Sequence, residues 1–76
     1  MVLLAGMEHD LRHENAERAL RFARELERLC TEPVAPEVLR ALRHHSPSAV
    51  LLGKGLTPLG VAHRYVALCR KRAEAQ

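Results

Sequence analysis

EHDLRHENAERALRFARELERLC, which spans residues 8–30, is the stretch that decides the fold, because it contains neither Gly nor Pro. At about 100° per residue, its apolar side chains gather on one half of a helical cylinder and its charged side chains on the other. The pattern predicts one long amphipathic helix over residues 8–30. Its apolar half holds Leu11, Ala16, Ala19, Leu20, Phe22, Ala23, Leu26, Leu29 and Cys30.

Three further helices are predicted, over residues 36–45, 47–52 and 58–72. Each begins with a proline, whose fixed φ and missing amide proton suit the first helical turn. Ser46 and Thr57 precede the last two of these prolines. Both are good N-cap residues, since their hydroxyls accept hydrogen bonds from free backbone amides.

The sequence therefore predicts an all-α fold, a small bundle of about four helices with two long outer helices and two short inner ones. A single domain is expected over residues 8–72, with a short connection at residues 31–35. Residues 1–7 are expected to form a flexible N-terminal tail and residues 73–76 a frayed end.

Charge divides the chain into two unlike halves. Residues 1–39 carry five Arg against eight acids, a balance of −3, whereas residues 40–76 carry seven Lys or Arg against Glu74, a balance of +6. Such a basic half favours an anionic partner, either an acidic protein surface or nucleic acid. The alternative is pairing with the acidic half of the same chain or of a second copy. The candidate partner-binding residues are His63, Arg64, Arg70, Lys71, Arg40 and Arg43.

No group of residues stands out as catalytic, and we predict that the protein is not an enzyme. Cys30 and Cys69 fall on apolar helix sides, where burial makes a thiol inert. His9 and His13 share one face of the first helix, but two histidines with no fixed third and fourth ligand do not define a metal site. The Gly-Lys-Gly at residues 53–55 lacks the strand that a phosphate-binding loop follows. Neither a metal nor a cofactor is expected.

Residues 46–72 also permit an alternative interpretation, a degenerate helix-turn-helix. Ala49 and Gly53 stand where that motif has a small residue and then a turn glycine, and Pro58 would open the recognition helix. The first turn of that helix, residues 58–62, offers almost nothing that reads a base edge. DNA binding would then rest on phosphate contacts from the basic residues.

The apolar arcs of both long helices span roughly 180°, which is wider than the stripe of about 100° that packs on one neighbour. We expect the surplus to meet another chain, as in a homodimer, although a monomer that covers it all is the alternative. The residues expected to mediate self-association are Ala19, Leu20, Ala23 and Leu26.

Together these features predict a small regulatory or adaptor protein that docks on a protein partner through helix faces. The alternative is a small DNA-binding transcriptional regulator. No apolar run is long enough to cross a bilayer, so no membrane partner is expected. No secretory signal is visible, and the two cysteines are predicted to remain reduced thiols. Both features favour a cytoplasmic location.

Overall fold

The computed structural model describes residues 2–31 and 33–75, and all regular secondary structure within them is α-helical. The predicted all-α fold is therefore confirmed, with one helix more than expected among the described residues. In chain order the helices are α1 (Val2–Arg12), α2 (Ala16–Leu29), α3 (Pro36–Arg43), α4 (Ser48–Gly53) and α5 (Pro58–Ala75).

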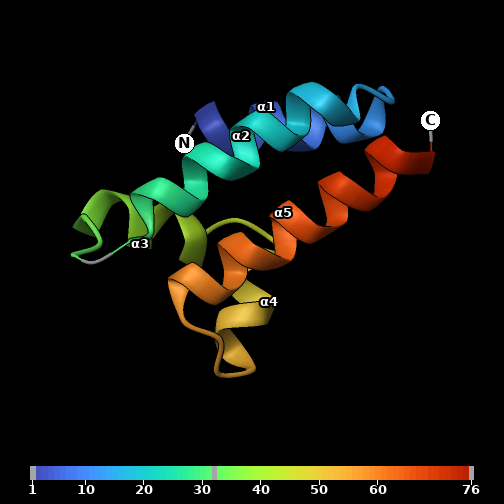
Figure 1. Ribbon diagram of the computed structural model, residues 1–76. Coiled ribbons are helices and arrows are strands. Elements are labelled where there is room, and N and C mark those ends of the chain that lie inside the picture. The colour runs from blue at the N-terminus through green and yellow to red at the C-terminus, as the bar shows by residue number, and fades with distance from the viewer. Residues whose placement is uncertain (1, 32, 76) are drawn as a thin grey trace.

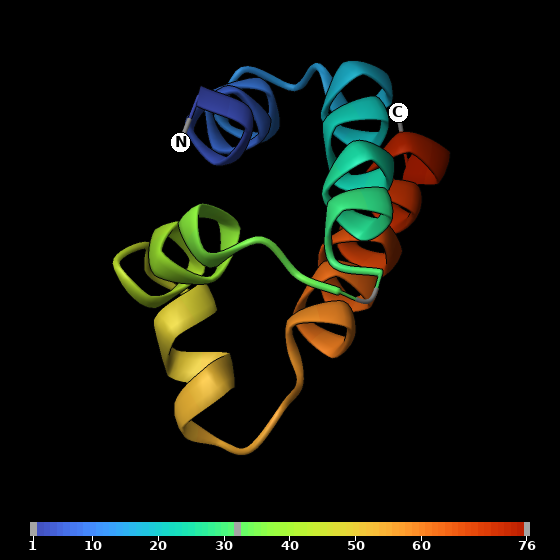
Figure 2. The ribbon, with the colours of Figure 1, turned by 90° about the vertical axis from the view of Figure 1, so that its left-hand side faces the viewer.

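The fold is built around α2 and α5, which lie side by side and run in opposite directions (Figure 1). α1 also packs against α2, so that α1 and α5 lie on either side of it (Figure 2). The short helices continue from this core, with α3 packed against α4 and α4 packed against α5. They therefore stand at the edge of the molecule and are not enclosed by the long helices.

The prediction of one continuous helix over residues 8–30 is wrong, because the chain turns at residues 13–15. Glu14 has a φ of 59°, and the amide of Asn15 donates a 2.7 Å hydrogen bond to the carbonyl oxygen of Asp10. Many helices end in this way, with one residue in the left-handed conformation and the next amide bonded to the carbonyl oxygen five residues earlier. Gly usually occupies the left-handed position. The turn separates α1 from α2 and lets them pack on each other.

The prediction of a flexible tail over residues 1–7 is also wrong, since α1 begins at Val2. Leu4 and Met7 are fully buried, and Gly6 lies against the ring of Phe22 in α2. A Cβ added at Gly6 would lie 3.2 Å from Cζ of Phe22, so the missing side chain permits this close approach. Met1 of the expected tail lies outside the described residues.

Other helix ends differ from the prediction by a few residues. α3 ends at Arg43 and not at residue 45. α4 covers Ser48–Gly53 in place of residues 47–52, after a cis Ser46–Pro47 peptide bond. α5 continues to Ala75, beyond the expected end at residue 72. Gln76 of the expected frayed end and Glu32 of the expected connection lie outside the described residues.

The predicted start of α5 is confirmed. This helix begins at Pro58, and the amide of Gly60 donates a 3.0 Å hydrogen bond to Oγ1 of Thr57. The threonine hydroxyl thus satisfies one of the free amides at the helix N-terminus.

The wide apolar arc of α2 is covered within the single chain. Ala19, Ala23 and Leu26 have no exposed surface, and Leu20 is half-buried. α1 contacts one flank of α2 and α5 contacts the other. A separate helix α1 was not predicted, and it is the second neighbour that covers this arc. The face expected to mediate self-association is therefore interior. Self-association itself stays a prediction, and it requires another surface.

Candidate docking surface

Three acids of the acidic half pair with Arg residues of the same half. Oε2 of Glu8 lies 3.6 Å from Nη2 of Arg12. Asp10 is almost fully buried, and its Oδ2 lies 3.4 Å from Nε of Arg18. Arg28 makes a two-pronged contact with the carboxylate of Glu25 on the same helix. These pairs join α1 to α2 or stay within one helix, so none of them involves a residue of the basic half.

Only histidines of the basic half contact acids of the acidic half, among the residues that the structure describes. Nε2 of His63 lies 3.2 Å from Oε2 of Glu27, and Nε2 of His45 lies 3.1 Å from Oε1 of Glu8. The second contact is an ion pair when His45 is protonated, but its geometry does not make a hydrogen bond.

The Lys and Arg residues of the basic half remain unpaired. No ion pair or side-chain hydrogen bond links them to any described residue, and all of them are exposed. Residues 38–73 contain no Asp or Glu. On α2, Arg21 and Arg24 are also exposed and form no ion pair with a described residue, but they belong to the acidic half. We use the name unpaired cations only for the seven side chains of the basic half: Arg40, Arg43, Lys54, Arg64, Arg70, Lys71 and Arg72.

The six predicted partner-binding residues do not form one patch. Arg40 and Arg43 lie on α3, whereas the others lie on α5, whose C-terminal half extends to the opposite end of the molecule (Figure 1). His63 and Arg70 line a small hollow beside Glu27, next to α2. The structure therefore separates a cationic group on α3 from a second group along α5.

Leu68 lies on the exposed side of α5, although it is a large apolar residue. Its side chain is 39% exposed. Arg64 and Arg72 lie four residues before and after it, on neighbouring positions of the helix surface. An apolar side chain thus stands among cations on the exposed side of α5.

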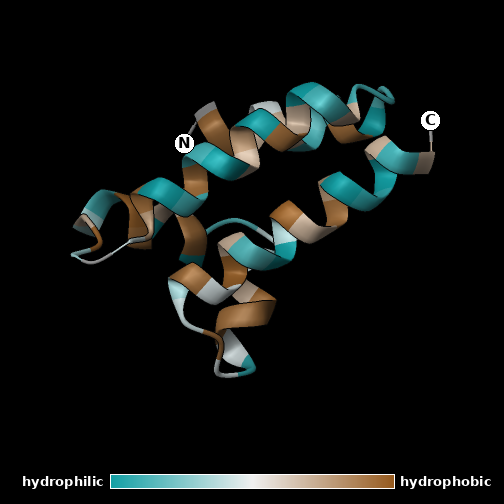
Figure 3. Cartoon of the chain, in the orientation of Figure 1, coloured by the Kyte–Doolittle hydropathy of each residue, from teal (hydrophilic) through white to brown (hydrophobic). Residues whose placement is uncertain are grey.

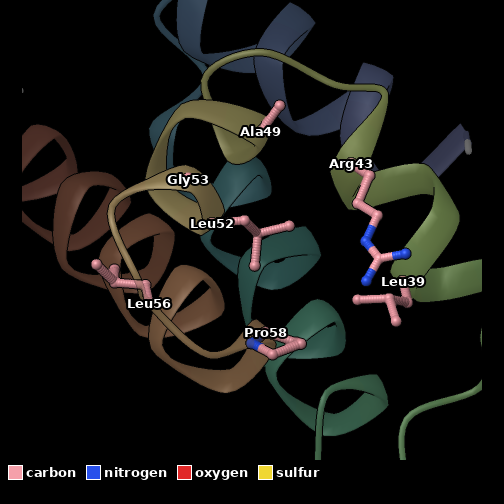
Figure 4. A pocket seen from close by; sticks show the side chains of 7 residues that line it. All are labelled: Leu39, Arg43, Ala49, Leu52, Gly53, Leu56 and Pro58. Atoms are coloured by element: carbon pink, nitrogen blue, oxygen red, sulfur yellow. The ribbon is translucent and has the colours of Figure 1, made fainter.

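A groove of about 580 Å³ opens between α3, α4 and the start of α5 (Figure 4). α3 provides a wall with the guanidinium of Arg43 beside Leu39, and Leu52 of α4 projects into the space. Each apolar side chain that lines it is half-buried and retains exposed surface. The lining residues are Leu39, Arg43, Ala49, Leu52, Gly53, Leu56 and Pro58.

Sequence reasoning missed this groove because it placed α4 inside the bundle. α4 is almost entirely apolar and stands at the edge of the molecule, as the brown colouring in Figure 3 shows. Val50 on this helix is 52% exposed. The run Ala-Val-Leu-Leu at residues 49–52 carries the signal, because four consecutive apolar residues of a helix point in different directions and cannot all face one core.

A polar contact joins α4 to α5 inside the core. Oγ of Ser48 and the hydroxyl of Tyr65 share a 2.8 Å hydrogen bond, and Ser48 has no exposed surface. Burial raises the pKa of Tyr65, although the Ser48 hydrogen bond acts in the opposite direction. Because the serine hydroxyl is enclosed and already bonded, this pair holds the helices together and is not placed to attack a substrate.

The two cysteines are buried and free, as predicted. Burial raises the pKa of the Cys30 thiol and of the Cys69 thiol, so the reactive thiolate form is disfavoured in both. These positions suit small apolar side chains of the core.

His9 and His13 stack on one face of α1, with ring centroids 4.3 Å apart and planes tilted by 36°. Nδ1 of His9 also lies 3.7 Å from Oδ1 of Asp10. Within residues 2–31 and 33–75, no three His, Cys, Asp or Glu side chains are arranged to hold a metal ion.

The first turn of α5 presents little polar surface to a nucleic acid. Leu59 and Gly60 are half-buried, and Val61 is fully buried against the core. A recognition helix needs polar side chains near its N-terminus to reach base edges. The structure places the cations of α5 farther along the helix, at residue 64 and beyond.

Over the described part of the chain, no helix has the length and apolar character needed to span a membrane. Comparisons with protein-family models, with curated proteins and with solved structures find no match to this chain.

Proposed function

We propose that this chain is a non-enzymatic regulatory or adaptor protein whose basic half docks on an acidic surface of a protein partner. The observation that carries the proposal is the uneven pairing of charge. Three of the five Arg in residues 1–39 pair with acids of that half, whereas none of the seven unpaired cations forms an ion pair with a described acid.

Exposed cations repel one another, and that repulsion is relieved when carboxylates of another molecule approach them. Arginine suits this role because its planar guanidinium binds a carboxylate through two parallel hydrogen bonds. Five of the seven unpaired cations are Arg.

A protein partner is favoured over DNA by the apolar surface that accompanies the cations. Val50 and Leu68 are exposed large apolar side chains, and the groove beside Arg43 is lined mainly by aliphatic groups. Burial of apolar side chains contributes strongly to association between proteins, whereas the phosphate backbone of DNA is bound mainly by charge.

The proposal is tested by selecting ligands for the wild-type chain from a displayed library of random peptides. We expect the selected peptides to be enriched in Asp and Glu relative to the unselected library. Enrichment of neutral or basic peptides, or no enrichment, would contradict the proposal.

A labelled DNA duplex titrated at several salt concentrations provides the comparison with the alternative function. Submicromolar binding at physiological salt, lost steeply as salt increases, would favour the DNA-binding regulator. The docking proposal predicts only the weak low-salt binding that any basic protein shows.

A further inference from the structure

We infer that the groove between α3, α4 and the start of α5 binds one amphipathic segment of an acidic protein partner, with its apolar side chains in the groove and a carboxylate on Arg43. This inference rests on the proposed function and names the site and the chemistry of the ligand. Its basis is the juxtaposition of an open aliphatic groove with an unpaired guanidinium.

The groove has the dimensions and lining of a binding site for side chains. Its volume of about 580 Å³ lies within the range of about 300–1,000 Å³ that is typical of ligand pockets. Leu39, Leu52 and Leu56 come from three different segments and all retain exposed surface. Covering these side chains would remove apolar area from water, which favours an aliphatic or aromatic occupant.

Charge complementarity identifies the rest of the occupant. Arg43 lines the groove itself, Arg40 lies one turn earlier on α3, and Lys54 directly follows the groove residue Gly53. Every lining residue comes from the stretch over residues 38–73, which contains no Asp or Glu. A basic or neutral polar segment would find no carboxylate there, whereas an acidic segment would pair with up to three cations.

An amphipathic helix or turn that carries both features would bind in the manner of helix-in-groove recognition, in which apolar anchors recur every three or four residues. The partner's carboxylate would meet the guanidinium of Arg43 beside apolar surface, where a charge-assisted hydrogen bond is stronger than in open water.

Gly53 permits a variant that blocks the groove without a change in charge. A Cβ built at Gly53 meets no atom within 4 Å, and the residue lies at the exposed end of α4. Gly53→Phe therefore introduces a ring at the groove without displacing the core, and Gly53→Ala serves as the matched control. Both variants should retain the helical circular dichroism spectrum of the wild type.

The experiment measures the affinity of one labelled acidic peptide, selected from the library on the wild-type chain. We expect Gly53→Phe and, independently, Arg43→Glu each to weaken binding at least about tenfold. The controls are Gly53→Ala and Arg21→Glu, of which the second changes a residue on the exposed side of α2. Each should change the affinity less than about twofold. The selected peptides should also contain apolar residues at helical spacing.

Normal binding to Gly53→Phe would overturn the groove inference. If such a peptide still required the unpaired cations of α5, for example by losing affinity for Arg64→Glu, the proposed function would stand and only its site would be wrong. A library that yields no acidic ligand would contradict both the proposed function and the groove inference. A DNA duplex that displaces the peptide and binds Gly53→Phe with wild-type affinity would assign the basic half to DNA.

Discussion

At the scale of single residues, the hydrogen bond between Ser48 and Tyr65 is the most specific polar contact of the core. Both groups are buried, and the bond joins α4, which lies at the edge of the molecule, to the long helix α5. Loss of either hydroxyl leaves the other without a partner, and a buried unsatisfied hydroxyl costs about 1–3 kcal/mol.

Tyr65→Phe is therefore expected to lower the free energy of unfolding by about 1–2 kcal/mol. The double variant Ser48→Ala/Tyr65→Phe should lose less than the sum of the two single variants, because no orphaned hydroxyl remains. Urea denaturation of the four proteins measures this coupling. Strict additivity would show that the bond contributes nothing beyond packing.

The raised pKa values of Cys30, Cys69 and Tyr65 predict a loss of stability at alkaline pH. The unfolded chain releases these protons near the ordinary values of 9.0 for Cys and 10.0 for Tyr, while the folded chain holds them to higher pH. Stability from these groups is therefore fully present below pH 9.0 and is lost as the pH rises through their raised pKa values.

We expect the free energy of unfolding to fall as the pH rises above 9.0, and to fall less steeply in Cys30→Ala/Cys69→Ala. Denaturant melts at a series of pH values measure both slopes. An identical slope in the double variant would rule out the cysteines as its source.

At the scale of elements, the sequence predicted helices best where a local signal set their ends. Thr57 and Pro58 form such a signal, and α5 begins where they place it. The end of α1 was missed because Glu14 occupies a left-handed position that usually belongs to Gly. A continuous apolar stripe needs an apolar residue three or four positions after Leu11. Glu14 and Asn15, which occupy these positions, are both polar, and this was the only hint of a break.

Thr57→Ala tests the cap of α5. It should lower the free energy of unfolding by about 1 kcal/mol without changing the fold, because the amide of Gly60 loses its acceptor. Thr57→Ser retains the hydroxyl and should be nearly neutral. A neutral Thr57→Ala variant in denaturant melts would mean that the hydroxyl does not stabilise this helix start.

Met7→Ala tests whether α1 belongs to the core. Met7 has no exposed surface, so its truncation should cost about 2–5 kcal/mol. In a flexible tail, the same change would be silent. Leu3→Ala, at a half-buried position of the same helix, is the control and should cost less. Thermal or urea melts that leave Met7→Ala unchanged would exclude the packing of α1 on α2.

At the scale of the whole molecule, the division of charge could be predicted from the sequence, whereas the burial of α2 could not. Composition alone predicted the division, since it requires only a count of residues along the chain. The groove and the covered face of Ala19, Ala23 and Leu26 required the tertiary structure, because they depend on where α1 and α4 pack. Periodicity shows that a helix has an apolar side, but it does not show which neighbour covers it.

Particular cations of the basic half, and not net charge, are proposed to bind the acidic partner. Two double variants with the same change in net charge separate these possibilities. Arg43→Glu/Arg64→Glu reverses one unpaired cation on α3 and one on α5, whereas Arg21→Glu/Arg24→Glu reverses two exposed residues of α2. Neither pair has an ion-pair partner among the described residues, so both proteins should melt within a few degrees of the wild type.

The most direct measurement is the affinity of a selected acidic peptide for these two double variants and the wild type at physiological salt. We expect a loss of affinity of at least about tenfold for Arg43→Glu/Arg64→Glu and of less than about threefold for Arg21→Glu/Arg24→Glu. Equal losses in the two variants would contradict it, because binding would then follow net charge and not the positions of the unpaired cations.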